Sequence, residues 1–112
     1  MSANTTIKTH IQWLNRGSHR LNVLDGIGRH DQRGDLPDQV TLLTSLKLTP
    51  GSSAYENGRL AIMGLIERGF VLNDAMQPRK YALRVNWEHI SVYSDWLEEH
   101  GKARLDVEKW QS

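Results

Sequence analysis

The fold of this chain is decided by the stretch Pro50-Gly-Ser-Ser-Ala-Tyr-Glu-Asn-Gly-Arg-Leu-Ala-Ile-Met-Gly-Leu-Ile-Glu-Arg-Gly-Phe-Val-Leu72. It predicts one helix, because Ser52 or Ser53 can accept a hydrogen bond from an unpaired amide of the first turn. Glu56 lies three residues after Ser53 and completes a capping box with it. The helix is predicted to end at Gly69, since glycine enters the left-handed conformation without steric cost. The apolar residues that follow Gly69 then begin a short strand.

The two faces of this helix differ in character. Small and apolar residues recur at three-to-four spacing and define the predicted buried face, which comprises Tyr55, Gly58, Ile62, Leu65, Ile66 and Gly69. The opposite face carries Ser53, Glu56, Asn57, Leu60, Met63 and Gly64. Its early turns are therefore polar toward the outside and its later turns apolar. An outward apolar patch is usually covered, here by a C-terminal helix or by a second subunit.

Two extended segments and a further helix are predicted after the central helix. Residues 70–72 and 80–85 are apolar or alternating, and the turn-rich residues 73–79 between them predict a hairpin. Asn86 can then cap a helix that Gly101 ends. The apolar positions of that helix are Trp87, Ile90, Tyr93 and either Trp96 or Leu97. Residues 102–112 alternate weakly and stay ambiguous.

The first third of the chain predicts two short helices and a polar loop. One helix within residues 6–16 has Ile7, Ile11 and Leu14 on its buried face, with Trp13 off that face or at its edge, and stops at Gly17. Ser18 caps the second, whose apolar pattern Leu21, Leu24 and Ile27 is broken by Gly26 and Gly28. A single bent helix is the alternative. Residues 28–35 are predicted to form a polar surface loop.

The next predicted helix opens at Asp35 and Pro37 and ends near Leu48. Its buried stripe is predicted to be Val40, Leu43 and Leu46, with Leu42 flanking. Residues 42–53 therefore give a helix, a short turn and the next helix. This order is similar to the helix-turn-helix pair that sets a recognition helix in the DNA major groove.

The segment Leu65-Ile-Glu-Arg-Gly-Phe-Val71 resembles the Leu-x-x-x-Gly-apolar-apolar junction of winged helix-turn-helix proteins from bacteria, phages and plasmids. In those proteins it joins the recognition helix to the wing, and the resemblance covers residues 36–85. It implies a mainly α fold with a small β-hairpin, an α+β winged helix-turn-helix. The 112 residues form one expected domain, with N-terminal helices and a basic loop over 1–34, the helix-turn-helix and wing over 35–86, and a C-terminal helix for dimerisation over 87–112.

The resemblance implies sequence-specific binding of double-stranded DNA by a homodimer, as a transcriptional repressor, another regulator or a DNA-organising factor. The residues expected to contact DNA come from the recognition helix, the wing and the polar loop: Ser52, Ser53, Glu56, Asn57, Arg59, Gln77, Arg79, Lys80, Arg29 and Arg33. A solvated helix face and an ordinary hairpin turn remain the alternatives. The expected dimer interface comprises Trp87, Tyr93, Trp96, Leu97 and Trp110, for which core packing is the alternative.

Charge and composition bear on the binding partner and on the location of the protein. The net charge is +1, but residues 1–34 carry five basic and two acidic groups while residues 87–112 carry three basic and six acidic. The basic end can therefore approach phosphates while the acidic end points away from them. The absence of cysteine excludes disulfides and thiolate metal sites. Neither a signal peptide nor an apolar run of about 20 residues occurs, so we expect a cytoplasmic protein without membrane association.

No constellation of residues predicts catalysis. The five histidines show no i, i+4 pair on one helix, and no serine lies in a Gly-x-Ser-x-Gly turn. We therefore expect no enzyme activity, no metal and no cofactor. The alternative function is a protein-binding module, such as a phage-encoded inhibitor that occupies a host protein.

Overall fold

The computed structural model describes residues 3–76 and 80–111, and within them it describes no side chain for residues 3–5 and 18. These residues form α1 (Ala3–Arg16), α2 (Ser18–Gln32), α3 (Gln39–Ser45), α4 (Ser53–Glu67), β1 (Val71–Asn73), β2 (Leu83–Val85), α5 (Trp87–Glu99) and the 3-10 helix η1 (Glu108–Gln111). The described part of the chain is thus mainly helical with a two-stranded antiparallel sheet, an α+β arrangement. None of its helices has the length and apolar character needed to cross a membrane.

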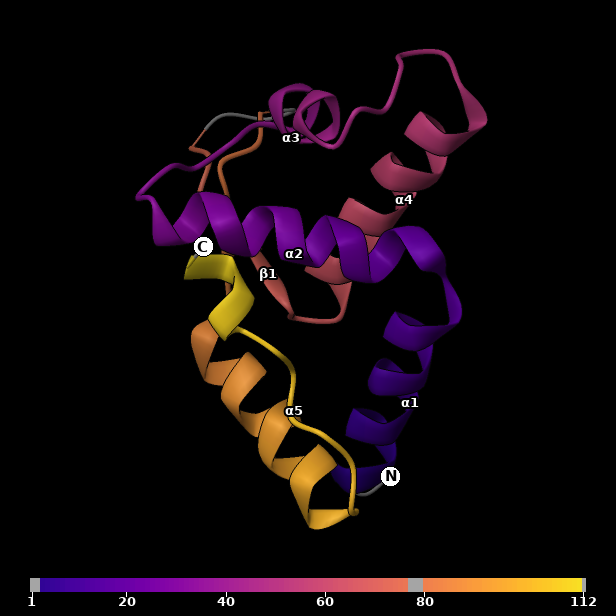
Figure 1. The fold of residues 1–112 in the computed structure, drawn as a ribbon, viewed down its shortest axis with the longest axis vertical. Helices are drawn as coiled ribbons and strands as arrows, with labels where there is room; N and C mark the ends of the chain where they lie inside the picture. Colours follow the sequence, from indigo (N-terminus) through magenta and orange to yellow (C-terminus); the bar gives the residue numbers. More distant parts are fainter. Residues whose placement is uncertain (1–2, 77–79, 112) are drawn as a thin grey trace.

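Helix α2 crosses the middle of the molecule and contacts α1, α3, α4, β2 and η1. Helices α1 and α5 leave it toward one end of the molecule, where they contact each other (Figure 1). Helix α3, the first turns of α4 and the outer part of the β1–β2 hairpin lie at the opposite end (Figure 1). The apolar side chains of all these elements share one core around α2.

Helix α2 is longer than the sequence predicted. Gly26 and Gly28 do not break it, and the predicted polar loop is helical as far as Gln32. Both glycines are buried because neighbours approach closely: a Cβ atom on Gly28 would lie 2.2 Å from the Trp110 ring, and one on Gly26 3.1 Å from Leu42. Packing thus offsets the roughly 1 kcal/mol that each glycine costs a helix relative to alanine. Gly17, not Ser18, is the N-cap, and it separates α1 from α2, so the two are not one bent helix.

Helix α3 begins later than predicted. Asp38 is its N-cap and accepts a 2.7 Å hydrogen bond from the Thr41 amide. A helix of seven residues buries Leu42 and Leu43 but leaves Val40, in the first turn, 58% exposed. Val40 was therefore wrongly predicted to be buried. The turn after α3 contains Lys47 with a φ of 64°.

Helix α4 confirms the central prediction with two corrections. Ser52 caps it by accepting a 3.1 Å hydrogen bond from the Tyr55 amide, so the predicted capping box of Ser53 and Glu56 does not form. Gly69 ends the helix region with a φ of 83°, as predicted. Gly64, predicted on the outward face, is buried because the Trp13 indole packs over it.

The hairpin is confirmed as an antiparallel pair in which Val71 faces Val85 and Asn73 faces Leu83. Two hydrogen bonds connect β2 to neighbouring segments. The Leu83 amide donates to the Pro37 carbonyl at 3.0 Å, which places the extended residues before α3 beside β2. The Val85 amide donates to Asp31 of α2 at 2.8 Å.

The C-terminal helix also follows the prediction. Asn86 caps α5 and Gly101 follows it with a φ of 71°. After α5 the chain returns to α2, where the Trp110 indole donates to buried Asp25 at 2.9 Å. Lys109 lies 2.9 Å from the same carboxylate.

Candidate nucleic-acid interface

The first turns of α4 lie free on the surface. Ser53, Glu56 and Asn57 are exposed, and the Arg59 side chain is 38% exposed. Ser52 is half-buried, because its hydroxyl caps the helix and donates to the Thr49 carbonyl at 2.7 Å. The structure therefore brings together the five residues predicted for the recognition helix.

The charge of Arg59 is not free. Its Nε donates to Glu56 at 3.0 Å, and this hydrogen bond lowers the pKa of Glu56 and raises the pKa of Arg59. A second N–H of Arg59 faces the Met63 sulfur at 3.4 Å. A phosphate at this position would have to compete with the Glu56 carboxylate.

The wing residues are described only in part. Gln77 and Arg79 lie outside the described residues. Lys80 is exposed, and its backbone carbonyl accepts a 3.2 Å hydrogen bond from Asn73. The pKa of Asp38 is lowered chiefly by hydrogen bonds from Thr41, with a smaller contribution from the positive charge of Lys80. Lys80 therefore lies near the start of α3.

Arg29 and Arg33 lie at the C-terminal end of α2 and not in a loop. Arg29 is half-buried within the helix, and Arg33 is the C-cap residue. The Arg33 Nε lies 3.6 Å from the Asp35 carboxylate, and His30 lies 3.6 Å from the same carboxylate. Asp35 thus offsets part of the positive charge at this end of α2, whereas Arg29 has no ion pair with the described residues.

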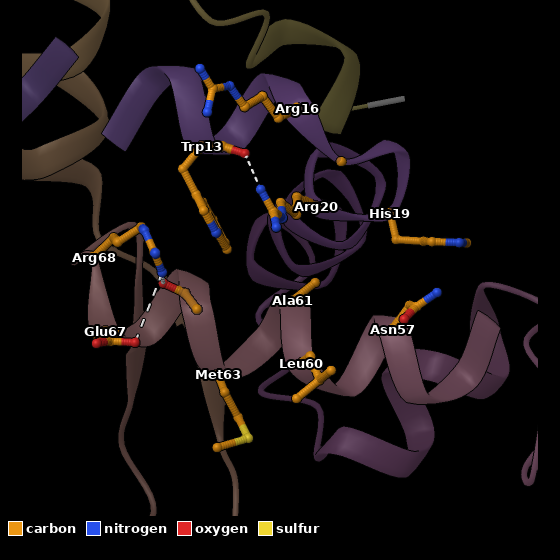
Figure 2. A pocket seen from close by; sticks show the side chains of 12 residues that line it. Trp13, Arg16, His19, Arg20, Asn57, Leu60, Ala61, Met63, Glu67 and Arg68 are labelled. Carbon is orange, nitrogen blue, oxygen red and sulfur yellow. Dashed lines mark hydrogen bonds and ion pairs between the residues drawn. The ribbon is translucent and has the colours of Figure 1, made fainter. Parts of the chain in front are cut away.

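An open hollow of about 650 Å³ lies between α4 and the corner where α1 passes into α2. Figure 2 shows this hollow from close by. Its walls come from the α1–α2 corner on one side and from the outward face of α4 on the other: Trp13, Arg16, Gly17, His19, Arg20, Asn57, Leu60, Ala61, Met63, Gly64, Glu67 and Arg68.

Trp13 is held between two arginines at one end of this hollow. The guanidinium carbon of Arg20 lies 4.4 Å from the indole centroid and that of Arg68 lies 4.0 Å from it, on the two sides of the ring (Figure 2). Arg20 also donates to the Trp13 carbonyl at 2.6 Å, and Arg68 donates to the Gly64 carbonyl at 3.2 Å. A Cβ atom on Gly64 would lie 2.3 Å from the indole, so only glycine permits this approach.

The sequence prediction missed this hollow, although it contained two signals. Trp13 did not fit the apolar stripe of its helix, and Gly64 stood in a helix interior, where glycine is unfavourable. Each signal is ambiguous alone, because the contact joins residues that are distant in the sequence.

A second pocket of about 480 Å³ lies where α1 and α5 meet the end of α4. His10 Nδ1 lies 2.8 Å from the Tyr93 hydroxyl, which donates to the Arg68 carbonyl at 3.1 Å. Burial, followed by the positive charges of Arg68 and His89, lowers the pKa of His10. Burial also raises the pKa of Tyr93.

The predicted dimer residues need correction. Tyr93, Trp96, Leu97 and Trp110 are buried within one chain, because α5 and η1 pack onto the shared core. Their burial requires no second subunit and leaves almost no surface for one. Trp87 remains 37% exposed, with its ring against that of Trp110 at a centroid distance of 5.5 Å.

Within the described residues, no three or more acidic or histidine side chains gather as they would to hold a metal ion. No family model, curated protein or solved structure matches this chain.

Proposed function

We propose that this chain is a non-enzymatic, cytoplasmic, sequence-specific binder of double-stranded DNA that regulates transcription, most simply as a repressor. The observation that carries the proposal is the pair α3 and α4, with the first turns of α4 exposed and a β-hairpin directly after it. A hydrogen bond from the Leu83 amide to the Pro37 carbonyl places the residues before α3 beside this hairpin.

The proposed interface follows from the chemistry of these side chains. Asn57 is exposed on the second turn of α4, and a carboxamide can bond both N6 and N7 of adenine in the major groove. Ser53 and Glu56 lie on the adjoining turn and would face neighbouring bases or phosphates. Lys80, in the hairpin, would contact the backbone without reading sequence. A net charge of +1 favours selective over indiscriminate binding.

We further propose that the protein binds DNA as a homodimer, since a two-fold pair of α4 helices would read two half-sites about 34 Å apart. Among the predicted interface residues, Trp87 is the one that retains an exposed surface. Light scattering measures the oligomeric state directly. A mass that corresponds to one protein chain per bound DNA at micromolar concentration would rule the dimer out.

A protein-binding module is the second candidate function, and two observations favour it. Leu60 and Met63 are about half exposed, at 51% and 45%, and lie one turn apart on the same face of α4, where they give a partner an apolar contact. Arg59 and Arg33, both predicted to meet phosphates, each have a carboxylate partner. A protein partner would bury Leu60 and Met63. It would not require arginines without carboxylate partners.

The experiment that separates the two functions is selection of bound fragments from genomic DNA, followed by fluorescence anisotropy with the recovered duplex. We expect the dissociation constant to rise steeply with salt. Asn57→Ala should weaken binding to the selected duplex by about tenfold, because one bidentate base contact contributes about 1–3 kcal/mol of discrimination. Lys80→Ala should weaken binding to all duplexes alike.

The matched control is Lys8→Ala, which removes an exposed charge from α1, the helix that extends toward the other end of the molecule. It should leave binding at the wild-type level. A wild-type protein that binds no DNA at low salt would refute the proposal and leave the protein-binding function.

A further inference from the structure

We propose that the α1–α2 corner is a second DNA contact, in which Arg16, His19 and Arg20 bind the phosphate backbone beside the bases that Asn57 faces. This inference rests on the proposed function and extends it to residues outside the helix-turn-helix and the wing. The occupant of the hollow is then a sugar–phosphate segment of the bound duplex.

The distribution of charge is the first argument. Among the described residues, Arg59 pairs with Glu56, Arg33 with Asp35 and Arg84 with Asp74. Arg16, His19 and Arg20 have no carboxylate of the described residues within ion-pair distance, so their donors are available to an external anion. Lys47, in the turn before α4, and Lys80, in the hairpin, likewise have no ion pair with the described residues, but at the α1–α2 corner two such cations, Arg16 and Arg20, line one hollow with α4.

The position of the α1–α2 corner also favours a contact with DNA. One hollow joins Arg16, Arg20 and the imidazole of His19 to the outward face of α4, and His19 and Asn57 lie at the same end of it (Figure 2). The single acidic residue among those that line the hollow, Glu67, lies at the other end, 3.9 Å from Arg68. No carboxylate lines the Asn57 end of the hollow, so an anion meets no repulsion there from the lining residues.

The Arg20 side chain is already ordered by its neighbours. Arg20 is fixed by its contact with the Trp13 ring and by its 2.6 Å hydrogen bond to the Trp13 carbonyl, neither of which neutralises its charge. A guanidinium that is already ordered loses little conformational entropy on binding phosphate. Its remaining N–H groups can donate to the phosphate oxygens.

The inference also accounts for the apolar side chains of the hollow. Leu60 and Met63 are exposed on α4 between the corner and solvent. A DNA strand presents apolar surface there, namely deoxyribose carbons and the methyl group of thymine. The hollow thus has cations of the α1–α2 corner on one side and apolar groups of α4 on the other. This mixed lining suits a nucleotide strand better than it suits a free inorganic anion.

The test is the salt dependence of binding, measured by anisotropy with the selected duplex and with an unrelated duplex. Each phosphate contact contributes about 0.9 to the slope of log K against log salt. Arg16→Ala should therefore lower the slope by about one and weaken both duplexes by a similar factor. Adding His19→Ala should weaken both further, whereas Asn57→Ala should affect the selected duplex most.

Lys8→Ala is the control on the same helix, and its slope should equal that of the wild type. The Arg16 side chain is exposed and makes no hydrogen bond or ion pair with the described residues, so the variant should fold, which circular dichroism checks. Single phosphates of the duplex can be replaced by neutral methylphosphonates. At one position this replacement should weaken binding by the wild type but not binding by Arg16→Ala.

The outcomes separate the two proposals. If the wild type binds the duplex, Asn57→Ala weakens that binding, and Arg16→Ala keeps the wild-type slope, the corner is not a contact and the proposed function stands. If the wild type binds no DNA at low salt, the proposed function fails and the corner contact fails with it.

Discussion

Single residues of this protein are explained by their neighbours in space more than by those in sequence. Gly64 is in the interior of α4, where alanine would favour the helix by about 1 kcal/mol. A larger residue does not fit here, because the edge of the Trp13 indole occupies the space that a Cβ atom would need. The same indole orders Arg20 and Arg68 on its two sides.

Gly64→Ala should therefore destabilise the protein by about 1–3 kcal/mol, because overpacking at the indole exceeds the gain in helix propensity. Urea unfolding followed by circular dichroism measures this. In a Trp13→Ala background the clash is gone, so the same substitution should be neutral or stabilising there. Equal destabilisation in both backgrounds would show that the indole is not the cause.

His10 gives a prediction about pH. Burial and nearby positive charges lower its pKa in the folded protein below the ordinary value of 6.5. The unfolded chain therefore binds the proton more tightly, and the stabilising effect of neutral His10 is full above pH 6.5 and is lost as the pH falls through the lowered folded pKa. The free energy of unfolding should fall between pH 7.5 and pH 5, on the basis of this shift.

His10→Gln is the matched variant, because its side chain retains a hydrogen-bonding group near the Tyr93 hydroxyl but does not titrate. Part of the decrease in stability should disappear in this variant. An unchanged pH dependence of urea unfolding would contradict the assignment to His10.

At the scale of elements, the predictions that held depended on local signals. Gly69, Asn86 and Gly101 mark chain positions that need a cap or a positive φ, and such positions are readable from a few neighbouring residues. Helix α4, the hairpin and α5 were therefore placed well. The exposure of Ser53 and Asn57 followed from the helical period alone.

The predictions that failed depended on tertiary packing. Gly26 and Gly28 look like helix breakers in sequence, yet Leu42 and Trp110 pack against them and α2 continues. The hollow beside α4 could not be predicted either, because it requires α1 to fold over Gly64. Tyr93, Trp96 and Leu97 lie in the core of one chain although they were predicted at a subunit contact, since amphipathic spacing does not distinguish a core from a subunit contact.

The attachment of η1 to α2 gives a prediction at this scale. Asp25 is 7% exposed, accepts from the Trp110 indole at 2.9 Å and lies 2.9 Å from Lys109. Asp25→Ala would leave a buried indole N–H without an acceptor and should cost about 1–3 kcal/mol. Asp25→Asn retains an acceptor and should cost less. Urea midpoints of the two variants test this order, and a smaller loss for alanine would contradict it.

At the scale of the whole molecule, the two ends differ in the elements that form them. Helix α3, the first turns of α4 and the hairpin lie at one end, while α1 and α5 meet at the other (Figure 1). The long axis spans 38 Å. The C-terminal residues 87–112 carry six acidic and three basic groups, which repel phosphates. The proposed function therefore fixes an orientation, with α4 toward DNA and the end of α5 away from it.

The absence of cysteine from the sequence makes this orientation measurable, because an iron chelate can be attached to one introduced thiol. From Thr49→Cys, before α4, the chelate should cleave the bound duplex near the half-site. From Glu99→Cys, at the end of α5, it should give little cleavage, since hydroxyl radicals act close to their source. Cleavage from Glu99→Cys alone would reverse the orientation. Protection of the duplex with cleavage from neither site would place both ends away from DNA and require another face of the molecule to bind it.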